Sequence, residues 1–481
     1  MRNTLRAALT CAAMTWAVLT APVARAADDL AQIRAELGQL RAAYEARIRA
    51  LEQRLQDTEQ RLTAATAGAG AAVAANSAAS VAGARLADAR PARNGPVPAA
   101  GFNPEIGLVL AGNWNRLSRD PADFGVRGFI PNGGEIGPGM RGFNLGESEL
   151  SLTANIDPLF AGRLIAALGA DNTASVEEAA VRSGALGQGL TVTFGRMLSG
   201  IGYLNSQHAH AWDFADAPLV YQAMFGSQYR NDGVQLKWLA PTERFVEFGL
   251  EFGSGAEFPA SASNRNGAGT VSLFGHVGDD LGDSASWRAG LSLQSARARE
   301  RSWTDLDAAG VNVTNAFTGK SRTWIADAVY KWAPGGNSTQ RNFKLQGEYF
   351  HRTESGDLTY DTQAASLGTA TDRYRSAQSG WYLQGIYQFI ANWRVGLRHD
   401  RLDAGRVAIG LVDNGTLTRA DFPALEGYRP SRTSLMLDWS PSEFSRVRLQ
   451  LARDRARPGG GDNQLFLQYI MSLGAHGAHT F

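Results

Sequence analysis

Apolar and polar residues alternate one by one along most of the chain after residue 100. The segments VQLKW (234–238), WRVGLR (393–398), RVRLQL (446–451) and ELSLTANI (149–156) all follow this pattern. Such alternation is typical of a β-strand with one apolar face and one polar face. The alternating stretches run for roughly nine to thirteen residues, about the length that a tilted strand needs to cross a bilayer.

The connections between the predicted strands alternate between short and long. Short connections fall at 157–158, 184–188, 240–243, 281–285, 333–338, 391–392 and 440–442. Long connections fall at 114–142, 198–230, 255–268, 299–318, 354–377 and 404–430. A transmembrane barrel with tight periplasmic turns and long external loops produces this rhythm. Counting the strands gives about sixteen, an even number, which predicts that both ends of the barrel lie on the periplasmic side.

Aromatic residues favour a membrane-spanning barrel over a soluble β-sandwich. Tryptophans flank the short turns, at Trp238, Trp287, Trp332, Trp393 and Trp439. Such a girdle marks the edge of the apolar band in membrane barrels. The last alternating strand ends in Phe481, which resembles the signal that outer-membrane assembly machinery recognises. The sequence therefore predicts an all-β fold for residues 101–481, a transmembrane antiparallel β-barrel of about sixteen strands.

The segment before residue 101 predicts an export signal, a coiled coil and a linker. Residues 1–26 are basic, then apolar, and end in Ala24-Arg25-Ala26, which fits a signal-peptidase site. In residues 27–62, apolar residues recur three and four apart between Arg and Glu, a heptad pattern with one stutter. Residues 63–100 are rich in Ala, Gly and Pro, as a linker is. The helix is expected in the periplasm, as a trimeric α-helical coiled coil or, alternatively, as a lone amphipathic helix.

Composition and charge exclude several classes of function. Lys and Arg number 47 and Asp and Glu 46, so the formal charge of +1 gives no signature of nucleic-acid binding. The one cysteine, Cys11, lies in the predicted signal peptide, which excludes a disulfide framework and a cysteine nucleophile in the mature chain. The seven histidines form no recognisable Ser/His or Asp/His motif, so we predict no catalytic residues and no enzyme activity.

The connection at 198–230 is unusually rich in apolar and aromatic residues for an external loop. A loop exposed to water should not have this composition, so we expect it to fold into the barrel and narrow the channel. Its predicted constriction residues are Tyr203, His208, His210, Trp212, Asp213 and Asp216. The alternative is that the loop packs against a neighbouring subunit as a latch.

Charges of both signs lie on the polar faces of the predicted strands. The expected lumen-facing residues are Lys237, Arg288, Arg394, Arg398, Arg446, Arg448, Glu149, Glu247 and Glu251. Because the two signs offset each other, we expect only modest ion selectivity.

Three segments are more specific than the alternating pattern. They are HAHAWDFADAPLVYQAMFG (208–226), SPSEFSRVRLQLARD (440–454) and DNQLFLQYIMSLGAHGAHTF (462–481). These segments resemble a family of proteobacterial outer-membrane barrels described as zinc-regulated, TonB-dependent-type receptors. The overall layout is also similar to that of trimeric porins, including those of the phosphate-selective type. The chain departs from a TonB-dependent transporter, since a coiled coil and a linker precede the barrel in place of a globular plug.

A zinc site is the most specific hypothesis for the 198–230 connection. His208 and His210 lie two residues apart, with Asp213 close behind, and in an extended segment both rings would face the same side. Two imidazoles and a carboxylate are a ligand set that zinc accepts, and the resemblance points to zinc. The alternative, which we favour, is that these side chains only hydrogen-bond to hold the loop in place. His476 and His479 form a poorer pair, and no other cofactor is expected.

The sequence thus predicts a porin-like channel for passive uptake of small hydrophilic solutes or ions across the outer membrane of a Gram-negative bacterium. The alternative is a zinc-regulated receptor or metal-uptake barrel. A third hypothesis makes the coiled coil a spacer that reaches toward peptidoglycan. Expected partners are the lipid bilayer, the outer-membrane assembly machinery, two further copies in a homotrimer, and a small solute or metal ion.

Overall fold

The computed structural model describes residues 104–132, 136–170, 173–184, 186–261 and 266–474. The predicted signal peptide (1–26), coiled coil (27–62), linker (63–100) and the terminal Phe481 lie outside the described residues. Within the described ranges, no helix is long and apolar enough to cross a membrane.

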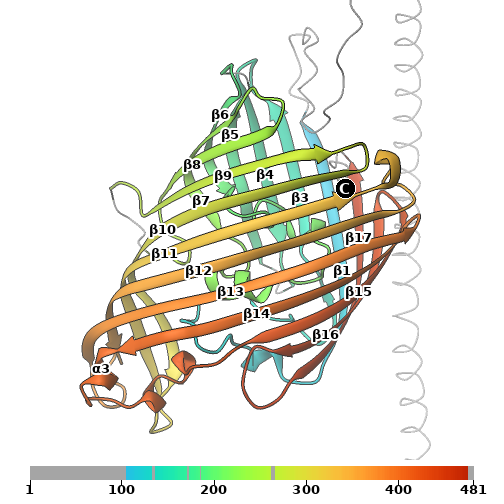
Figure 1. Ribbon diagram of the computed structural model, residues 1–481. Coiled ribbons are helices and arrows are strands. Elements are labelled where there is room, and N and C mark those ends of the chain that lie inside the picture. The colour runs from blue at the N-terminus through green and yellow to red at the C-terminus, as the bar shows by residue number, and fades with distance from the viewer. Residues whose placement is uncertain (1–103, 133–135, 171–172, 185, 262–265, 475–481) are drawn as a thin grey trace, which may run out of the picture. The chain divides into compact units, whose positions relative to one another are not determined.

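Antiparallel strands form one closed sheet in the described part of the chain (Figure 1). The first segments are β1 (Glu105–Leu117), β2 (Gly142–Leu145), β3 (Ser148–Asn155), β4 (Phe160–Leu168), β5 (Ala174–Ser183), β6 (Leu190–Leu198), β7 (Arg230–Leu239), β8 (Phe245–Gly253) and β9 (Thr270–Leu281). The others are β10 (Ala285–Leu306), β11 (Asn312–Trp332), β12 (Asn342–Tyr360), β13 (Ala370–Ile390), β14 (Trp393–Ile409), β15 (Ser431–Ser442), β16 (Ser445–Arg455) and β17 (Asp462–Gly474). Neighbours in the chain pair with one another, and β1 closes the barrel by pairing with β17.

The barrel has sixteen strand positions, as the sequence predicts. β2 and β3 both pair with β1 and are two parts of one strand, separated at Gly146 and Glu147. The prediction of an all-β antiparallel barrel is therefore confirmed for the described residues.

Side chains on the strands alternate between an apolar outer wall and a polar interior. In β15, Leu435 and Leu437 face outward and remain 48% and 37% exposed, whereas Arg432, Ser434 and Asp438 face inward and are buried. A soluble barrel has the opposite arrangement. The alternation read from the sequence therefore has its apolar face on the outside, as a barrel in lipid requires.

Five strands, β10–β14, have 17 to 22 residues and are longer than predicted (Figure 1). The long connections predicted at 299–318 and 354–377 are therefore wrong in extent. Only residues 307–311 and 361–369 remain outside the strands there.

The outward residues of β13 explain this error. Trp381 and Leu383 face outward in its second half, whereas Arg373 and Arg375 do so in its first half. Backbone pairing continues past the apolar belt, but the outer face there is polar. Because outward positions there are polar, the alternation of apolar outward and polar inward residues ends before the strand does.

Aromatic rings line one edge of the outer wall. Trp393 and Trp439 lie opposite each other on β14 and β15 and stack with ring centroids 5.9 Å apart. Trp238 stacks on Phe248 at 6.2 Å. These residues adjoin the short turns, as the girdle interpretation of the sequence requires.

The barrel end opposite the short turns has a packed cap. The connection between β14 and β15 contains α3 (Gly410–Asp413), η5 (Arg419–Asp421) and η6 (Pro423–Leu425). Its apolar side chains pack with those at the far ends of the long strands, in a cluster formed by Leu411, Phe422, Leu425, Phe317, Leu358 and Tyr360 among others. Two further short helices are η2 (Pro121–Asp123), in the connection between β1 and β2, and η4 (Pro334–Gly336), in the turn between β11 and β12.

A charge on the outer wall should destabilise the barrel strongly. Leu397 of β14 faces outward and is 56% exposed, so the substitution Leu397→Arg should place a guanidinium in lipid and cost about 2–4 kcal/mol at mid-membrane depth. The measurement is the free energy of unfolding by urea in phospholipid vesicles. Leu367→Arg is the matched control, because Leu367 is 65% exposed on a loop outside the strands and should tolerate the change. Equal effects of the two substitutions would contradict a lipid-facing outer wall.

Candidate functional site

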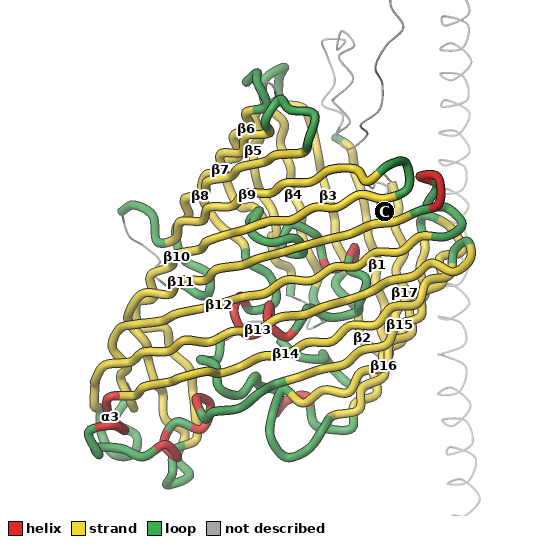
Figure 2. The backbone as a smooth tube through the Cα atoms, viewed as in Figure 1, coloured by secondary structure: helices red, strands yellow, loops and turns green. Residues whose placement is uncertain are grey.

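The connection between β6 and β7, residues 199–229, lies inside the barrel and is called the lumen loop below. Figure 2 shows loop and helix segments enclosed by the strands. The Ser199 hydroxyl donates a hydrogen bond to Glu251 of β8 (2.5 Å), and the Leu219 N–H donates one to Asp400 of β14 (2.9 Å). Since both acceptors face inward from distant strands, the lumen loop crosses the interior of its own barrel.

The apolar residues of the lumen loop form a core with the barrel wall. All seven residues of α2 (Leu219–Phe225) are buried. Tyr221 meets the ring of Phe350 edge-on at 5.0 Å, in a cluster that also contains Tyr382 and Leu402 of the wall. The apolar composition of this connection, unexpected for an external loop, is thus accounted for by burial inside the barrel.

Asp213 of the lumen loop lies against cations on β12 and β14. Its carboxylate is 2.5 Å from Lys344 Nζ and 3.1 Å from an Arg394 nitrogen. Burial alone would raise the pKa of Asp213, but the charges of Lys344 and Arg394 lower it well below its usual range. The group therefore remains ionised at neutral pH.

Asp216 makes a second set of ion pairs nearby. Its oxygens lie 2.7 Å from Arg398 and 2.6 Å from Arg432, both almost fully buried. Burial alone would raise the pKa of Asp216 as well, and the charges of Arg432 and Arg398 lower it. Arg448 adds a hydrogen bond to the Trp212 carbonyl oxygen at 2.7 Å. We call these cations the basic wall: Lys344, Arg394, Arg398, Arg432 and Arg448.

His208, the N-cap of η3 (Ala209–Ala211), and His210, the middle residue of η3, contact carboxylates on β3 and β5. His208 Nδ1 lies 2.9 Å from Glu177 and 3.4 Å from Glu149, and its Nε2 lies 3.7 Å from Glu178. His210 Nδ1 lies 2.6 Å from Glu149. The two rings stack with centroids 5.8 Å apart. We call Glu149, Glu177 and Glu178 the acidic wall.

The pKa of His208 reflects these carboxylates. Burial alone would lower it, but the hydrogen bond to Glu177 and the nearby carboxylates of Glu178 and Glu149 raise it to about 10. A proton on His208 thus adds positive charge to the acidic wall, beside Arg163 and Arg230.

A β-bulge in β5 builds part of the acidic wall. Ile165 of β4 pairs with Glu178 and the next residue, Ala166, pairs with Val176, so Glu177 has no partner in the register. Glu177 and Glu178 are adjacent, yet both are buried. Regular alternation would place them on opposite faces, so the sequence pattern could not identify this pair.

A second irregularity precedes Glu149, which itself faces inward by the regular alternation of β3. Gly146 and Glu147 interrupt the strand between β2 and β3, and the Gly146 N–H donates to the Ala111 carbonyl oxygen (2.8 Å). A Cβ on Gly146 would lie 2.8 Å from the Ala111 side chain, so this close approach requires glycine. Bulges commonly re-aim side chains next to functional sites.

The other residues predicted to face the lumen also have partners there. Lys237 pairs with Glu247 at 2.9 Å, and Arg288 donates to the Gly202 carbonyl oxygen at 3.2 Å and lies over the ring of Tyr203. Arg446 donates to the carbonyl oxygen of His210. The predicted constriction residues therefore lie inside the barrel, on the lumen loop. His208 and His210 contact the acidic wall, whereas Trp212, Asp213 and Asp216 contact the basic wall. The sequence analysis did not identify four wall residues that contact the lumen loop: Glu177, Glu178, Lys344 and Arg432.

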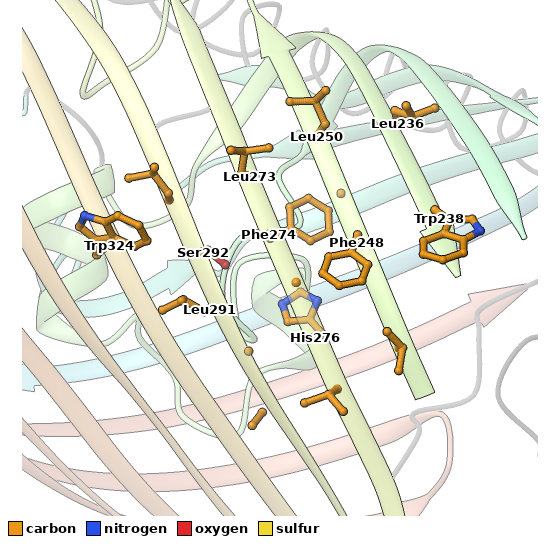
Figure 3. Close-up of a pocket in the computed structure, with 17 residues that line it drawn as sticks. Leu236, Trp238, Phe248, Leu250, Leu273, Phe274, His276, Leu291, Ser292 and Trp324 are labelled. Carbon is orange, nitrogen blue, oxygen red and sulfur yellow. The ribbon is translucent and has the colours of Figure 1, made fainter. Parts of the chain in front are cut away.

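A recess of about 770 Å³ lies in the barrel wall across β7–β11 (Figure 3). Its lining is mostly outward-facing and apolar, including Leu236, Leu273 and Trp324. Phe274 fills the space left by a glycine on the neighbouring strand, where a Cβ on Gly249 would lie 1.9 Å from the Phe274 ring. The recess faces the lipid side and not the lumen, so it is not the candidate site for a hydrophilic solute.

No family model matches the chain. An uncharacterized protein of Aquifex aeolicus (strain VF5) is 29% identical over 415 residues, which cover 80% of this chain and 81% of that protein. Among solved structures, an anion-selective porin from Comamonas acidovorans is 11% identical, covers 78% of this chain and 100% of its own, and has a TM-score of 0.47. The outer membrane channel DcaP of Acinetobacter baumannii is 10% identical, with 78% and 98% covered and a TM-score of 0.45.

Removing one loop carboxylate should destabilise the barrel, because it breaks ion pairs of buried cations. Asp216→Asn should cost about 3 kcal/mol, the low end of the range for a broken buried pair, since Arg398 and Arg432 would keep only Asp400 and Asp454 as counter-ions. The measurement is urea unfolding in vesicles. Asp403→Asn is the control, because Asp403 pairs with Arg429 at 3.5 Å in an exposed position and should change stability by about 1 kcal/mol or less.

Mild acid should not release the lumen loop from the basic wall. The pKa values of Asp213 and Asp216 are lower in the folded protein than the ordinary 3.8. Their contribution to stability is therefore fully present above pH about 4 and is lost only as the pH falls through the lower folded values. Hydrogen exchange of residues 199–229, corrected for the intrinsic pH dependence, should show equal protection of the Asp213–Asp216 segment at pH 7 and pH 5. A loss of protection with a midpoint near pH 5 would be inconsistent with this assignment.

Proposed function

We propose that the protein is an outer-membrane channel for passive diffusion of small hydrophilic solutes or ions, narrowed by the lumen loop. The observation that supports this most is a closed barrel with an apolar exterior and a charged loop bound to its inner wall. An apolar exterior suits residence in a bilayer, and a polar interior suits passage of water and solutes.

The partly exposed cations inside the barrel each lie beside a carboxylate that offsets their charge. Arg163, Arg230 and Lys237 keep 50%, 33% and 33% of their side-chain surface exposed, and their acidic partners keep 11%, 6% and 15%. The basic wall is mostly buried and is neutralised by Asp213 and Asp216 together with Asp400 and Asp438 of the strands, so it should contribute little field to the passage. This arrangement supports modest ion selectivity over strong anion selectivity.

We also propose that the protein is a homotrimer. A hydrophobic heptad seam in residues 27–62 needs partners, and three parallel barrels would bring three such helices together. Each barrel is closed by itself, since β1 pairs with β17 of the same chain, so a trimer would contain three separate channels.

A receptor or metal-uptake barrel is the second candidate function. The cluster of histidines and carboxylates at the acidic wall favours it, because imidazole and carboxylate together can bind a metal ion. In that case the main activity would be binding of a metal ion and not passive diffusion of solutes.

Planar-bilayer recordings test the channel proposal. The purified protein should give discrete single-channel steps, and Asp213→Ala/Asp216→Ala should raise the mean conductance severalfold and add current noise, because the lumen loop would lose its attachment to the basic wall. Asp403→Ala is the control and should match the wild type. No conductance at any voltage, from either the wild type or the double variant, would exclude a channel and favour the receptor function.

A further inference from the structure

Three side chains from different elements converge inside the barrel on one small volume. Glu149 of β3, Glu177 of β5 and His208 of the lumen loop are all buried, and each offers a ligand atom within 4.8 Å of the others. We propose that they form a binding site for a divalent transition-metal ion of the zinc class, with the fourth position open to water or, after a movement of its ring, to His210. This site is independent of the proposal that the barrel conducts.

The distances between ligand atoms fit a tetrahedral ion. Zinc bonds of about 2.0–2.1 Å to nitrogen and oxygen give tetrahedron edges of about 3.3 Å. His208 Nδ1 lies 2.9 Å from Glu177 and 3.4 Å from Glu149. Shifts of a few tenths of an ångström would therefore admit the ion between these atoms. His210 lies outside this group of three: its Nδ1 is 2.6 Å from Glu149, and its ring would have to move to reach the ion.

The surroundings match those of histidine ligands in known metal sites. A ligating histidine usually directs its other ring nitrogen toward a carboxylate or carbonyl. His208 Nε2 is buried without a hydrogen-bond partner and faces Glu178 at 3.7 Å. Glu178 is itself held by Arg163 at 3.0 Å. A ring that coordinates through Nδ1 thus has an oriented acceptor for its Nε2–H.

The charge of the acidic wall favours a cation. The wall supplies three carboxylates, and two arginines pair with it: Arg163 with Glu178 and Arg230 with Glu177. Glu149 contacts the imidazoles of His208 and His210. The wall therefore needs a further positive charge, which a protonated imidazole or a bound metal ion can provide. Neutral imidazole is the form that binds metal.

The ligand set differs from the one that the sequence suggests. Asp213 is ion-paired with Lys344 and Arg394, and it is not among the residues whose ligand atoms converge with His208. Its place is taken by Glu149, which the alternation of β3 directs inward, and by Glu177, which the bulge in β5 directs inward. Nitrogen ligands favour zinc, cobalt or nickel over calcium and magnesium, which prefer oxygen alone.

A bound ion would fasten the lumen loop to β3 and β5. Asp213 and Asp216 already attach the other part of the loop to the basic wall, so metal would fix both ends. Occupancy of the site would then restrain the element that we propose to narrow the channel.

Metal titration of the full chain tests the site. After chelator treatment, zinc chloride is titrated by calorimetry and cobalt(II) by absorption, in a His476→Gln/His479→Gln background that removes the C-terminal histidine pair. We expect one zinc ion per chain with micromolar or tighter affinity, and cobalt bands in the visible range typical of four-coordinate nitrogen and oxygen ligands.

Variants distinguish the loss of metal ligands from a general effect on folding. Glu149→Gln/Glu177→Gln should weaken zinc binding by about a hundredfold or more, whereas Glu247→Gln, which alters a carboxylate beside His276, should bind as tightly as the parent. If the double variant fails to fold, as judged by heat-modifiable mobility on gels, His208→Gln with its smaller charge change takes its place. No binding tighter than about millimolar in the parent, or unchanged affinity in the folded variants, would overturn the proposal and leave the channel function untouched.

Discussion

The pairing of buried charges between the lumen loop and the barrel wall is the interaction on which the rest of the interior depends. Arg398, Arg432 and Arg448 are almost completely buried, and an unpaired guanidinium in such a place would be prohibitively costly. The strands supply three carboxylates to the basic wall, Asp400, Asp438 and Asp454, against its five cations. Asp213 and Asp216 of the lumen loop supply the other two negative charges, and these ion pairs fix the position of residues 199–229.

Apolar packing occupies one part of the lumen, and ion pairs occupy another. α2 and its aromatic neighbours fill one part of the interior with a core that excludes water. Carboxylates of the loop meet the basic wall, and its imidazoles meet the acidic wall on β3 and β5. In the proposed channel, solute would pass through the region lined by partly exposed side chains such as Lys237 and Arg230. The inward fold of the lumen loop would make that passage narrow.

The parts of the structure that follow local alternation could be predicted from the sequence. The alternation of apolar and polar residues with a period of two predicts the barrel and its sixteen strands. It also predicts the inward direction of Arg446 and Arg448. The inward fold of the lumen loop could be predicted from its apolar composition. The extent of β10–β14 could not, because outward residues such as Arg373 and Arg375 are polar beyond the apolar belt. The pairing of Glu177 with His208 could not either, because a bulge puts two consecutive residues on one face.

The density of residues 199–229 in a cryo-EM map of the protein in lipid nanodiscs tests the central claim most directly. The account predicts density across the inside of each barrel, with the Asp216 carboxylate between Arg398 and Arg432 and the His208 ring beside Glu177. Density for these residues outside the barrel, packed as a latch on a neighbouring subunit, would contradict it.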